Sequence, residues 1–270
     1  MAHKNSTLLL GAIALGLTLT SGAAKAAKCS NDGGAYAAWV EQTTAEAASQ
    51  GIGQRGLSAL ANTRYSKATI SADRNQKSFK LSFDQFMKVR GGATIISKGK
   101  SMRKANAALF DSIEQRFGVP AGPLLAIWGM ETGFGGFMGG ENVLSATATL
   151  SYDCRRSEFF TDHLYALLQL IDSGAVSPDA KGAKHGELGH TQFLPANVLR
   201  YGVDGDGSGG VNMNSKADAL ASTANFLKGK GWSRGGGYQP GEANFGAIQG
   251  WNAATVYQKA IAYIGAEIDG

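Results

Sequence analysis

Cysteine, proline and charged residues are scarce in this sequence. Two cysteines and five prolines occur among 270 residues, and charged residues make up only 17%. The 38 glycines follow no Gly-X-Y period, which excludes a collagen-like chain. The apolar fraction of 43% excludes a disordered chain, which would contain fewer apolar residues and carry more net charge. What remains is a folded protein with one sizeable core, or with two lobes around a cleft.

The motifs of several common enzyme classes are also missing. The sequence contains no Walker motif, no HExxH motif, and no GxGxxG motif between a strand and a helix. His185 and His190 are five residues apart and no cysteine pair has zinc spacing, so surface histidines are expected rather than a zinc site. The net charge is only +5 and no run of lysine or arginine occurs, so nucleic acid is not an expected partner.

The N-terminus has the three parts of a secretory signal peptide. A basic start is followed by an apolar run at residues 8–19 and by the small-x-small sequence at residues 24–26. The apolar run is shorter than the roughly 20 residues that span a bilayer, so stable membrane insertion is not expected. We therefore expect cleavage after residue 26 and a periplasmic protein with a net charge of +3.

Cys29 and Cys154 are the only cysteines, and the exported compartment is oxidising. We predict a disulfide between them that ties the N-terminal segment to the rest of the chain; two unpaired thiols are the alternative. A lipid anchor on Cys29 is a further alternative, but Lys28 stands where a lipobox has a small residue.

The hydrophobic periodicity is mostly helical and includes no convincing alternating strands, so the predicted fold class is mainly α. Residues 61–103 are mixed, polar and interrupted by glycine. Helices are expected over 36–50, 52–60, 105–117, 120–131 and 219–228, after a cap at Ser157, and after a cap at Asn252.

Glu131 is the most informative single residue. It ends the apolar helix predicted over 120–131, and the glycine-rich sequence TGFGG follows it. A carboxylate among apolar side chains is poorly solvated, which raises its pKa and makes it a candidate proton donor near neutral pH. The alternative is a helix-end glutamate that points into water.

The sequence DGDGSGGVN, which begins at Asp204, resembles the first part of an EF-hand loop. Asp204, Asp206 and Ser208 supply oxygen ligands at positions 1, 3 and 5, but Ser215 stands where a bidentate glutamate is usual. Ser215 and Asp218 are also spaced like a capping box before the next helix. Two outcomes stay open: a weak structural calcium site, or a Gly/Asp-rich turn without an ion.

Several further motifs occur in order and together resemble one family. These are DRNQKSF from Asp73, FGVP from Phe117, IWGMETGFG from Ile127, LSATATLSYDCRRSEFF from Leu144, GELGHTQFLP from Gly186, DALASTANFL from Asp218 and WNAATVY from Trp251. The chain resembles a lytic murein transglycosylase of the B type, a family with a lysozyme-like catalytic core. The likeness extends over residues 35–268.

The resemblance implies an organisation and a set of site residues. It implies an N-terminal helical region over 27–104 packed on the core, and a lysozyme-like catalytic domain over 105–270 that carries the EF-hand-like loop. Glu131 corresponds to the family's catalytic acid. The substrate-binding positions that it implies are Gln192, Asn252, Tyr257, Arg155, Arg156 and Phe226. Two departures are Ala183, where the family has a serine, and Phe226, which lacks the hydroxyl of a tyrosine.

The activity that the resemblance implies is cleavage of the β-1,4 bond between N-acetylmuramic acid and N-acetylglucosamine in peptidoglycan, with formation of 1,6-anhydromuramic ends. No cofactor is required for this chemistry. Glycan strands are the expected partner, and proteins of the cell-wall machinery are a further class of partner. Two alternatives stay open. One is a hydrolytic muramidase that pairs Glu131 with Glu141, Asp153 or Glu158; the other is a scaffold that binds glycan or a cell-wall protein without cleavage.

Overall fold

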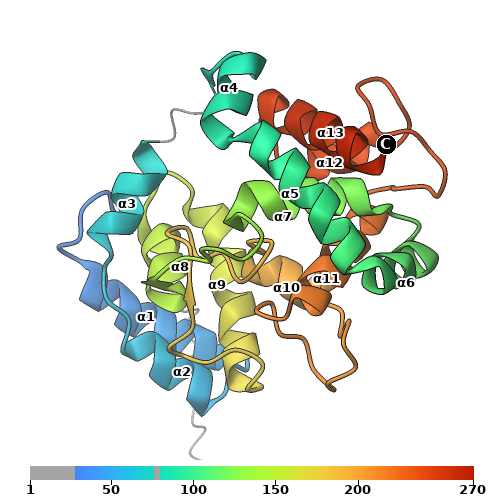
Figure 1. The fold of residues 1–270 in the computed structure, drawn as a ribbon. Helices are drawn as coiled ribbons and strands as arrows, with labels where there is room; N and C mark the ends of the chain where they lie inside the picture. Colours follow the sequence, from blue (N-terminus) through green and yellow to red (C-terminus); the bar gives the residue numbers. More distant parts are fainter. Residues whose placement is uncertain (1–27, 76–79) are drawn as a thin grey trace, which may run out of the picture.

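The computed structural model describes residues 28–75 and 80–270, and the predicted signal peptide lies outside them. The described residues form thirteen helices and two short strands (Figure 1). The helices are α1 (Tyr36–Ser49), α2 (Gln54–Ala61), α3 (Lys67–Arg74), α4 (Phe83–Arg90), α5 (Gly92–Ala105), α6 (Ala107–Phe117), α7 (Ala121–Thr132), α8 (Val143–Tyr152), α9 (Ser157–Asp172), α10 (Pro195–Tyr201), α11 (Lys216–Gly229), α12 (Phe245–Trp251) and α13 (Thr255–Asp269). Strands β1 (Glu141–Asn142) and β2 (Lys181–Gly182) pair antiparallel, with Glu141 opposite Gly182.

The predicted mainly α class is confirmed, and the structure adds helices where the sequence signal is mixed. Helices α3 and α4 lie within residues 61–103, and α5 begins within them and ends at Ala105. Serine side chains cap α3 and α4, and Ser82 forms a reciprocal capping box with Gln85. Helix α9 begins at Ser157 itself, with Arg156 as its N-cap, so the predicted cap is one residue off.

The N-terminal helices pack in two places rather than as one layer (Figure 1). Helices α1, α2 and α3 lie against α8 and α9, whereas α4 and α5 lie against α13 and α7. Helix α5 ends at Ala105, so the boundary predicted between residues 104 and 105 coincides with the end of a helix. The division into two regions at that point stays a prediction.

Helices α7 and α13 approach each other closely because glycines face the contact. A Cβ atom at Gly122 would lie 2.3 Å from the carbonyl oxygen of Gly265, which no side chain can tolerate. The Gly122 amide also donates to Asp269 Oδ1 at 2.8 Å, so α13 supplies an acceptor for the first turn of α7. This contact allows the backbones of α7 and α13 to lie close together.

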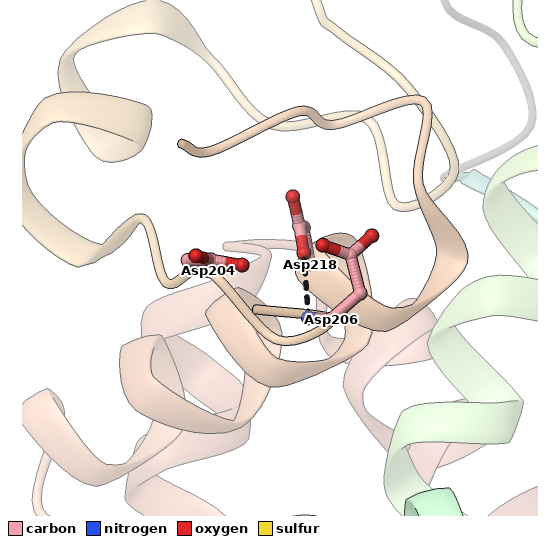
Figure 2. Close-up of side chains that lie close together, drawn as sticks. All are labelled: Asp204, Asp206 and Asp218. Carbon is pink, nitrogen blue, oxygen red and sulfur yellow. Dashed lines mark hydrogen bonds between the residues drawn. The ribbon is translucent and has the colours of Figure 1, made fainter. Parts of the chain in front are cut away.

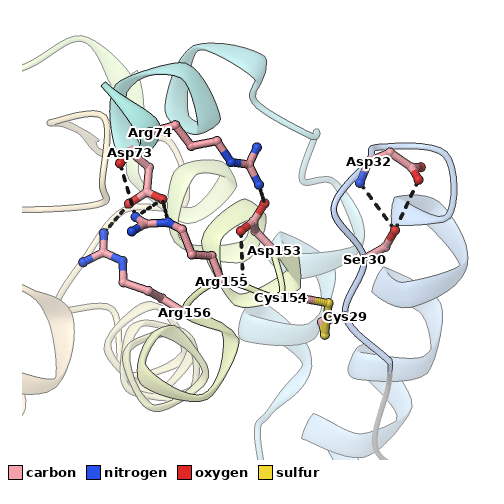
Figure 3. Close-up of polar contacts among 9 residues, drawn as sticks. All are labelled: Cys29, Ser30, Asp32, Asp73, Arg74, Asp153, Cys154, Arg155 and Arg156. Carbon is pink, nitrogen blue, oxygen red and sulfur yellow. Dashed lines mark hydrogen bonds and ion pairs between the residues drawn. A yellow bond between two sulfur atoms is a disulfide. The ribbon is translucent and has the colours of Figure 1, made fainter. Parts of the chain in front are cut away.

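The N-terminal segment is fastened to the start of α9 by covalent and ionic contacts (Figure 3). The predicted Cys29–Cys154 disulfide is confirmed. Beside it, the Ser30 amide donates to the carbonyl of Tyr152, and Asp153 forms an ion pair with Arg74 of α3. The segment around Cys154 thus holds both the chain start and α3 in place.

Among the described residues, no helix combines the length and the apolar character that crossing a membrane requires.

Replacing both cysteines by serine should lower the free energy of unfolding by about 2–4 kcal/mol, because the disulfide closes a long loop in the unfolded chain. The bond joins residues 125 apart in sequence. Urea denaturation of the variant and of the unreduced wild type, followed by circular dichroism, measures this difference. Equal unfolding midpoints and equal slopes would show that the disulfide contributes no stability.

Candidate active site

Glu131 is the one residue of α7 that is not buried. Every other residue from Ala121 to Thr132 is buried, and the mean hydropathy of the helix is accordingly high. Glu131 retains partial exposure one residue before the end of the helix. Gly133 then ends α7 in the left-handed conformation, with a φ of 60°. The only charged residue of the helix therefore stands at the single point where the helix reaches solvent.

Two donors hold one oxygen of this carboxyl group. The Tyr257 hydroxyl of α13 donates to Glu131 Oε1 at 2.6 Å, and the Trp251 indole N–H of α12 donates to the same oxygen at 3.2 Å. No described residue forms a hydrogen bond with Oε2. The carboxyl group is thus oriented through one oxygen, while the other has no protein partner among the described residues.

Burial raises the pKa of Glu131 from 4.5 to about 7, because the apolar surroundings disfavour the charged form. The hydrogen bonds from Tyr257 and Trp251 oppose this rise, since they stabilise the carboxylate. Among the charged neighbours, Glu187 raises the pKa and Arg90 lowers it. A pKa near 7 leaves a large fraction of Glu131 protonated at neutral pH, as a general acid requires.

Both donors are supported by aromatic rings. Tyr257 is buried and its ring meets Phe86 of α4 edge to face at 6.0 Å. Burial and the nearby Glu131 carboxylate raise the pKa of Tyr257 well above its usual 10, so its hydroxyl remains a donor. Trp251 contacts Phe193 and Phe226, with centroids 5.5 and 5.2 Å away.

This arrangement places two of the expected substrate-binding residues inside the protein. Phe226 has 4% of its surface exposed and packs on Trp251, so its ring supports a donor to Glu131 instead of presenting a surface to a sugar. Tyr257 is 3% exposed and its hydroxyl is bonded to Glu131. Both residues therefore lie at the site, as the family motif implies. Because they are buried, they contact Trp251 and Glu131 and do not form an exposed surface.

Gln192 lies near the loop that follows Glu131. Its amide Nε2 donates to the carbonyls of Gly189 at 2.7 Å and Met138 at 3.3 Å. Gln192 and Phe134 are the only non-glycine residues with positive φ in the described part of the chain, at 53° and 65°. Such strain persists only where surrounding contacts impose it, and it concentrates at functional sites. The Oε1 atom of Gln192 has no hydrogen-bond partner among the described residues.

Asn252 follows Trp251 directly and is partly exposed. Its Oδ1 accepts from the Ala254 amide at 2.9 Å and its backbone carbonyl accepts from Gln258. The amide nitrogen has no hydrogen-bond partner among the described residues. Asn252 therefore offers a donor in the segment that carries Trp251, while Gln192 offers an acceptor.

Arg155 and Arg156 both bind the buried carboxylate of Asp73 (Figure 3). Arg155 Nε donates to Asp73 Oδ2 at 2.6 Å, and Arg156 binds the other oxygen. Their side chains remain 44% and 35% exposed. Two cations thus share one acid, which leaves a local positive charge at the junction of α3 and α9.

The EF-hand-like loop gathers three carboxylates, and one of them was not predicted as a ligand (Figure 2). Oxygen atoms of Asp204, Asp206 and Asp218 lie within 4.8 Å of one another. Asp218 is fully buried and accepts from the amides of Gly205, Asp206 and Asn212. Carboxylate oxygens suit a hard cation such as calcium, so this donor set fits the ion.

The predicted capping box at Ser215 and Asp218 is wrong. The Ser215 hydroxyl donates to Asp206 Oδ2 at 2.7 Å, and it makes no cap bond to α11. Asp218 points instead to the loop, because the backbone amides of residues 205, 206 and 212 surround it. The spacing of an acid three residues after serine fits both arrangements, so the sequence did not distinguish them.

Trp251 and Glu187 are the site residues that the sequence argument did not identify. Trp251 stands in the WNAATVY motif beside Asn252, which was the available signal. Glu187 lies in a turn closed by the Ala183 amide bonded to the Glu187 carbonyl, and no spacing relates it to Glu131. Two hollows of about 540 and 510 Å³ lie elsewhere, and none of the residues bonded to Glu131 lines them.

Comparison with solved structures finds the same fold. SltB3 from Pseudomonas aeruginosa, in complex with NAG-anhNAM-pentapeptide, superposes with a TM-score of 0.80 at 26% identity over 88% of this chain and 80% of SltB3. Escherichia coli lytic transglycosylase Slt35, in complex with calcium, superposes with a TM-score of 0.75 at 22% identity over 85% of this chain and 92% of Slt35. The predicted mainly α, lysozyme-like fold is confirmed, whereas calcium at the EF-hand-like loop stays a prediction.

Comparison of sequences leads to the same family. The chain is 37% identical over 123 residues to membrane-bound lytic murein transglycosylase B of Escherichia coli (strain K12). That match covers 45% of this chain and 34% of the relative, so it spans about a third of the relative's length. The model of the transglycosylase SLT domain matches residues 35–241. Since these residues are well over half of the chain, the protein belongs to the transglycosylase SLT domain family.

Proposed function

We propose that the protein is a lytic transglycosylase that cleaves the β-1,4 bond between N-acetylmuramic acid and N-acetylglucosamine in peptidoglycan, leaving 1,6-anhydromuramic ends. The observation that carries the proposal is Glu131, an acid with a pKa of about 7 that is oriented through one oxygen. The complex of SltB3 with NAG-anhNAM-pentapeptide, a fragment with an anhydro end, supports the product assigned here.

One carboxyl group suffices for this reaction. Protonated Glu131 gives its proton to the glycosidic oxygen as the bond from that oxygen to C1 of the muramyl sugar breaks. The Glu131 carboxylate then takes the proton of the C6 hydroxyl of the same sugar, and that oxygen bonds to C1. The proton returns to Glu131, no water is consumed, and the muramyl residue closes into a 1,6-anhydro ring.

The remaining site residues are proposed to hold the substrate. The unpartnered acceptor of Gln192 and donor of Asn252 suit the hydroxyl and N-acetyl groups of a sugar. The exposed guanidinium groups of Arg155 and Arg156 suit the carboxylates of a peptide stem or of the muramyl lactyl group. Tyr257, Trp251 and, through Trp251, Phe226 position Glu131.

A hydrolase of the common type would pair Glu131 with a second carboxylate. Asp153, one of the three partners considered, is buried and paired with Arg74. Hydrolytic muramidase action therefore remains the second candidate, and its product distinguishes it. Cleavage by water leaves a reducing end, whereas the proposed reaction leaves an anhydro end lighter by one water.

Location and ion content are part of the proposal. Peptidoglycan as substrate and the predicted signal peptide favour the periplasm, with proteins of the cell-wall machinery as further partners. The carboxylates of Asp204, Asp206 and Asp218 would hold calcium as a structural ion, and Ser208 would add an oxygen. The calcium complex of Slt35 supports this reading.

Glu131→Gln should reduce activity on purified sacculi by about 10²–10⁴-fold, because glutamine keeps the shape but supplies no proton. Mass spectrometry of the digests should find anhydromuropeptides from the wild type. Glu267→Gln, on the exposed side of α13, is the matched control and should retain full activity.

Other outcomes of this experiment are equally informative. Undiminished activity of the Glu131→Gln variant would remove Glu131 from the mechanism. Reducing muropeptides alone would identify a hydrolase, and no products from the wild type would favour a glycan-binding scaffold.

Tyr257→Phe should shift the pH dependence of kcat/KM. The lost hydrogen bond stabilises the carboxylate, so its removal raises the pKa of Glu131 above about 7. Because the protonated form starts the reaction, the decline of kcat/KM on the basic side should move to higher pH. Tyr263→Phe, a half-exposed tyrosine on the same helix, should leave the profile unchanged. A profile that Tyr257→Phe leaves in place would contradict this role.

Millimolar calcium should raise the melting temperature of the wild type, because an ion that binds only the folded loop stabilises it. Asp206→Asn removes an exposed ligand and should abolish the increase. Differential scanning calorimetry with and without chelator measures the effect. An identical melting temperature in both conditions would show that the loop binds no calcium.

A further inference from the structure

Phe137 is the most exposed large apolar side chain among the described residues, with 75% of its surface accessible. The rings that pack around Trp251 and Tyr257, the two donors to Glu131, are by contrast buried or partly buried. An exposed phenylalanine gives up the free energy that burial of its ring would supply. Core packing therefore does not account for the position of Phe137.

The loop that carries Phe137 is tied to the residue that follows Glu131. The Phe137 amide donates to the Thr132 carbonyl at 3.1 Å, and the Gly135 amide donates to Thr132 Oγ1 at 2.9 Å. That hydroxyl in turn donates to the His190 carbonyl at 2.7 Å. The exposed ring of Phe137 therefore projects from a loop whose backbone is bonded to the end of α7.

The other side of the loop is tied to Gln192. Its Nε2 donates to the carbonyl of Met138, the residue directly after Phe137. At the next position, a Cβ on Gly139 would lie 2.0 Å from the Gly182 carbonyl oxygen, so the loop packs tightly against β2. The loop that carries Phe137 is therefore bonded on one side to the residue that follows the candidate acid and on the other to the proposed sugar-binding amide.

A pyranose ring has the surface chemistry that such a side chain accepts. One face of an N-acetylhexosamine presents several C–H bonds, and the face of an aromatic ring carries negative charge density that attracts their positive hydrogens. Dispersion between the two flat surfaces adds to this attraction. A rigid loop makes the contact without the entropic cost of ordering a flexible segment.

We infer that Phe137 is a stacking platform for an N-acetylhexosamine ring of the glycan strand, in a subsite beside the scissile bond. This inference rests on the proposed function, because the substrate class is taken from it. Phe137 makes no contact with the reacting atoms in this role: it binds one sugar ring and so sets the register of the strand relative to Glu131.

The test uses glycan strands freed of their peptides, so that contacts between peptide stems and Arg155 or Arg156 do not contribute. Binding is measured by isothermal titration calorimetry with the full chain carrying Glu131→Gln, which prevents cleavage. Adding Phe137→Ala should raise Kd by about five- to tenfold, and Phe137→Trp should restore or strengthen binding. Phe159→Ala, which removes another half-exposed phenylalanine from α9, is the control and should leave Kd unchanged. Equal melting temperatures of the variants confirm that Phe137→Ala is folded.

The inference is overturned if Phe137→Ala binds the strands as tightly as its parent, or if the parent does not bind them. Digestion by the wild-type enzyme separates this failure from a failure of the proposed function. Anhydro products together with an unchanged Kd would refute the platform alone. Reducing products together with a Phe137-dependent Kd would refute the transglycosylase reaction and leave the platform in place.

Discussion

A carboxyl group on a helix whose other residues are all buried is poorly solvated, and its properties depend on the few groups that reach it. For Glu131 these are the Tyr257 hydroxyl and the Trp251 indole N–H, which bind the same oxygen. Burial favours the protonated form and the two donors favour the carboxylate, so the pKa settles near 7. That balance lets one group give a proton and then take one at the same pH.

The balance depends on helix packing well away from the carboxyl group. The glycine contact between α7 and α13 brings Tyr257 to Glu131, and Phe86 of α4 holds the tyrosine ring. Helix α4 lies within residues 27–104, the stretch predicted to form an N-terminal region, so a helix of that stretch contacts the tyrosine bonded to Glu131. The disulfide and the Asp153 ion pair fasten the N-terminal segment and α3 beside α8 and α9, against which α1, α2 and α3 pack.

Much of this architecture follows from the sequence alone, because local signals are strong where helices are long and periodic. The helix ending at Glu131 and the Cys29–Cys154 bond were both predicted, the first from apolar composition and the second because no other cysteine exists. Helix α8 was not predicted, since nearly all of its residues are buried, serine and threonine included, and such a helix lacks a clear apolar period.

Features that depend on tertiary contacts were harder to foresee. The left-handed backbone of Gln192 is imposed by its surroundings, and no residue preference predicts it. The burial of Phe226 against Trp251 could not be predicted from the motif either. A motif identifies residues that belong to a site, but it does not show which of them face the substrate. The pairing of Arg155 and Arg156 with Asp73 joins residues about eighty positions apart.

The central claim is that a large fraction of Glu131 is protonated at neutral pH because of where the fold places it. Carbon-13 NMR of protein labelled at the glutamate side-chain carboxyl, with the Glu131 signal assigned by its loss in Glu131→Gln, measures this protonation directly. The account predicts a titration midpoint of about 7 for that signal. A midpoint near 4.5, the value of an ordinary glutamate, would contradict it.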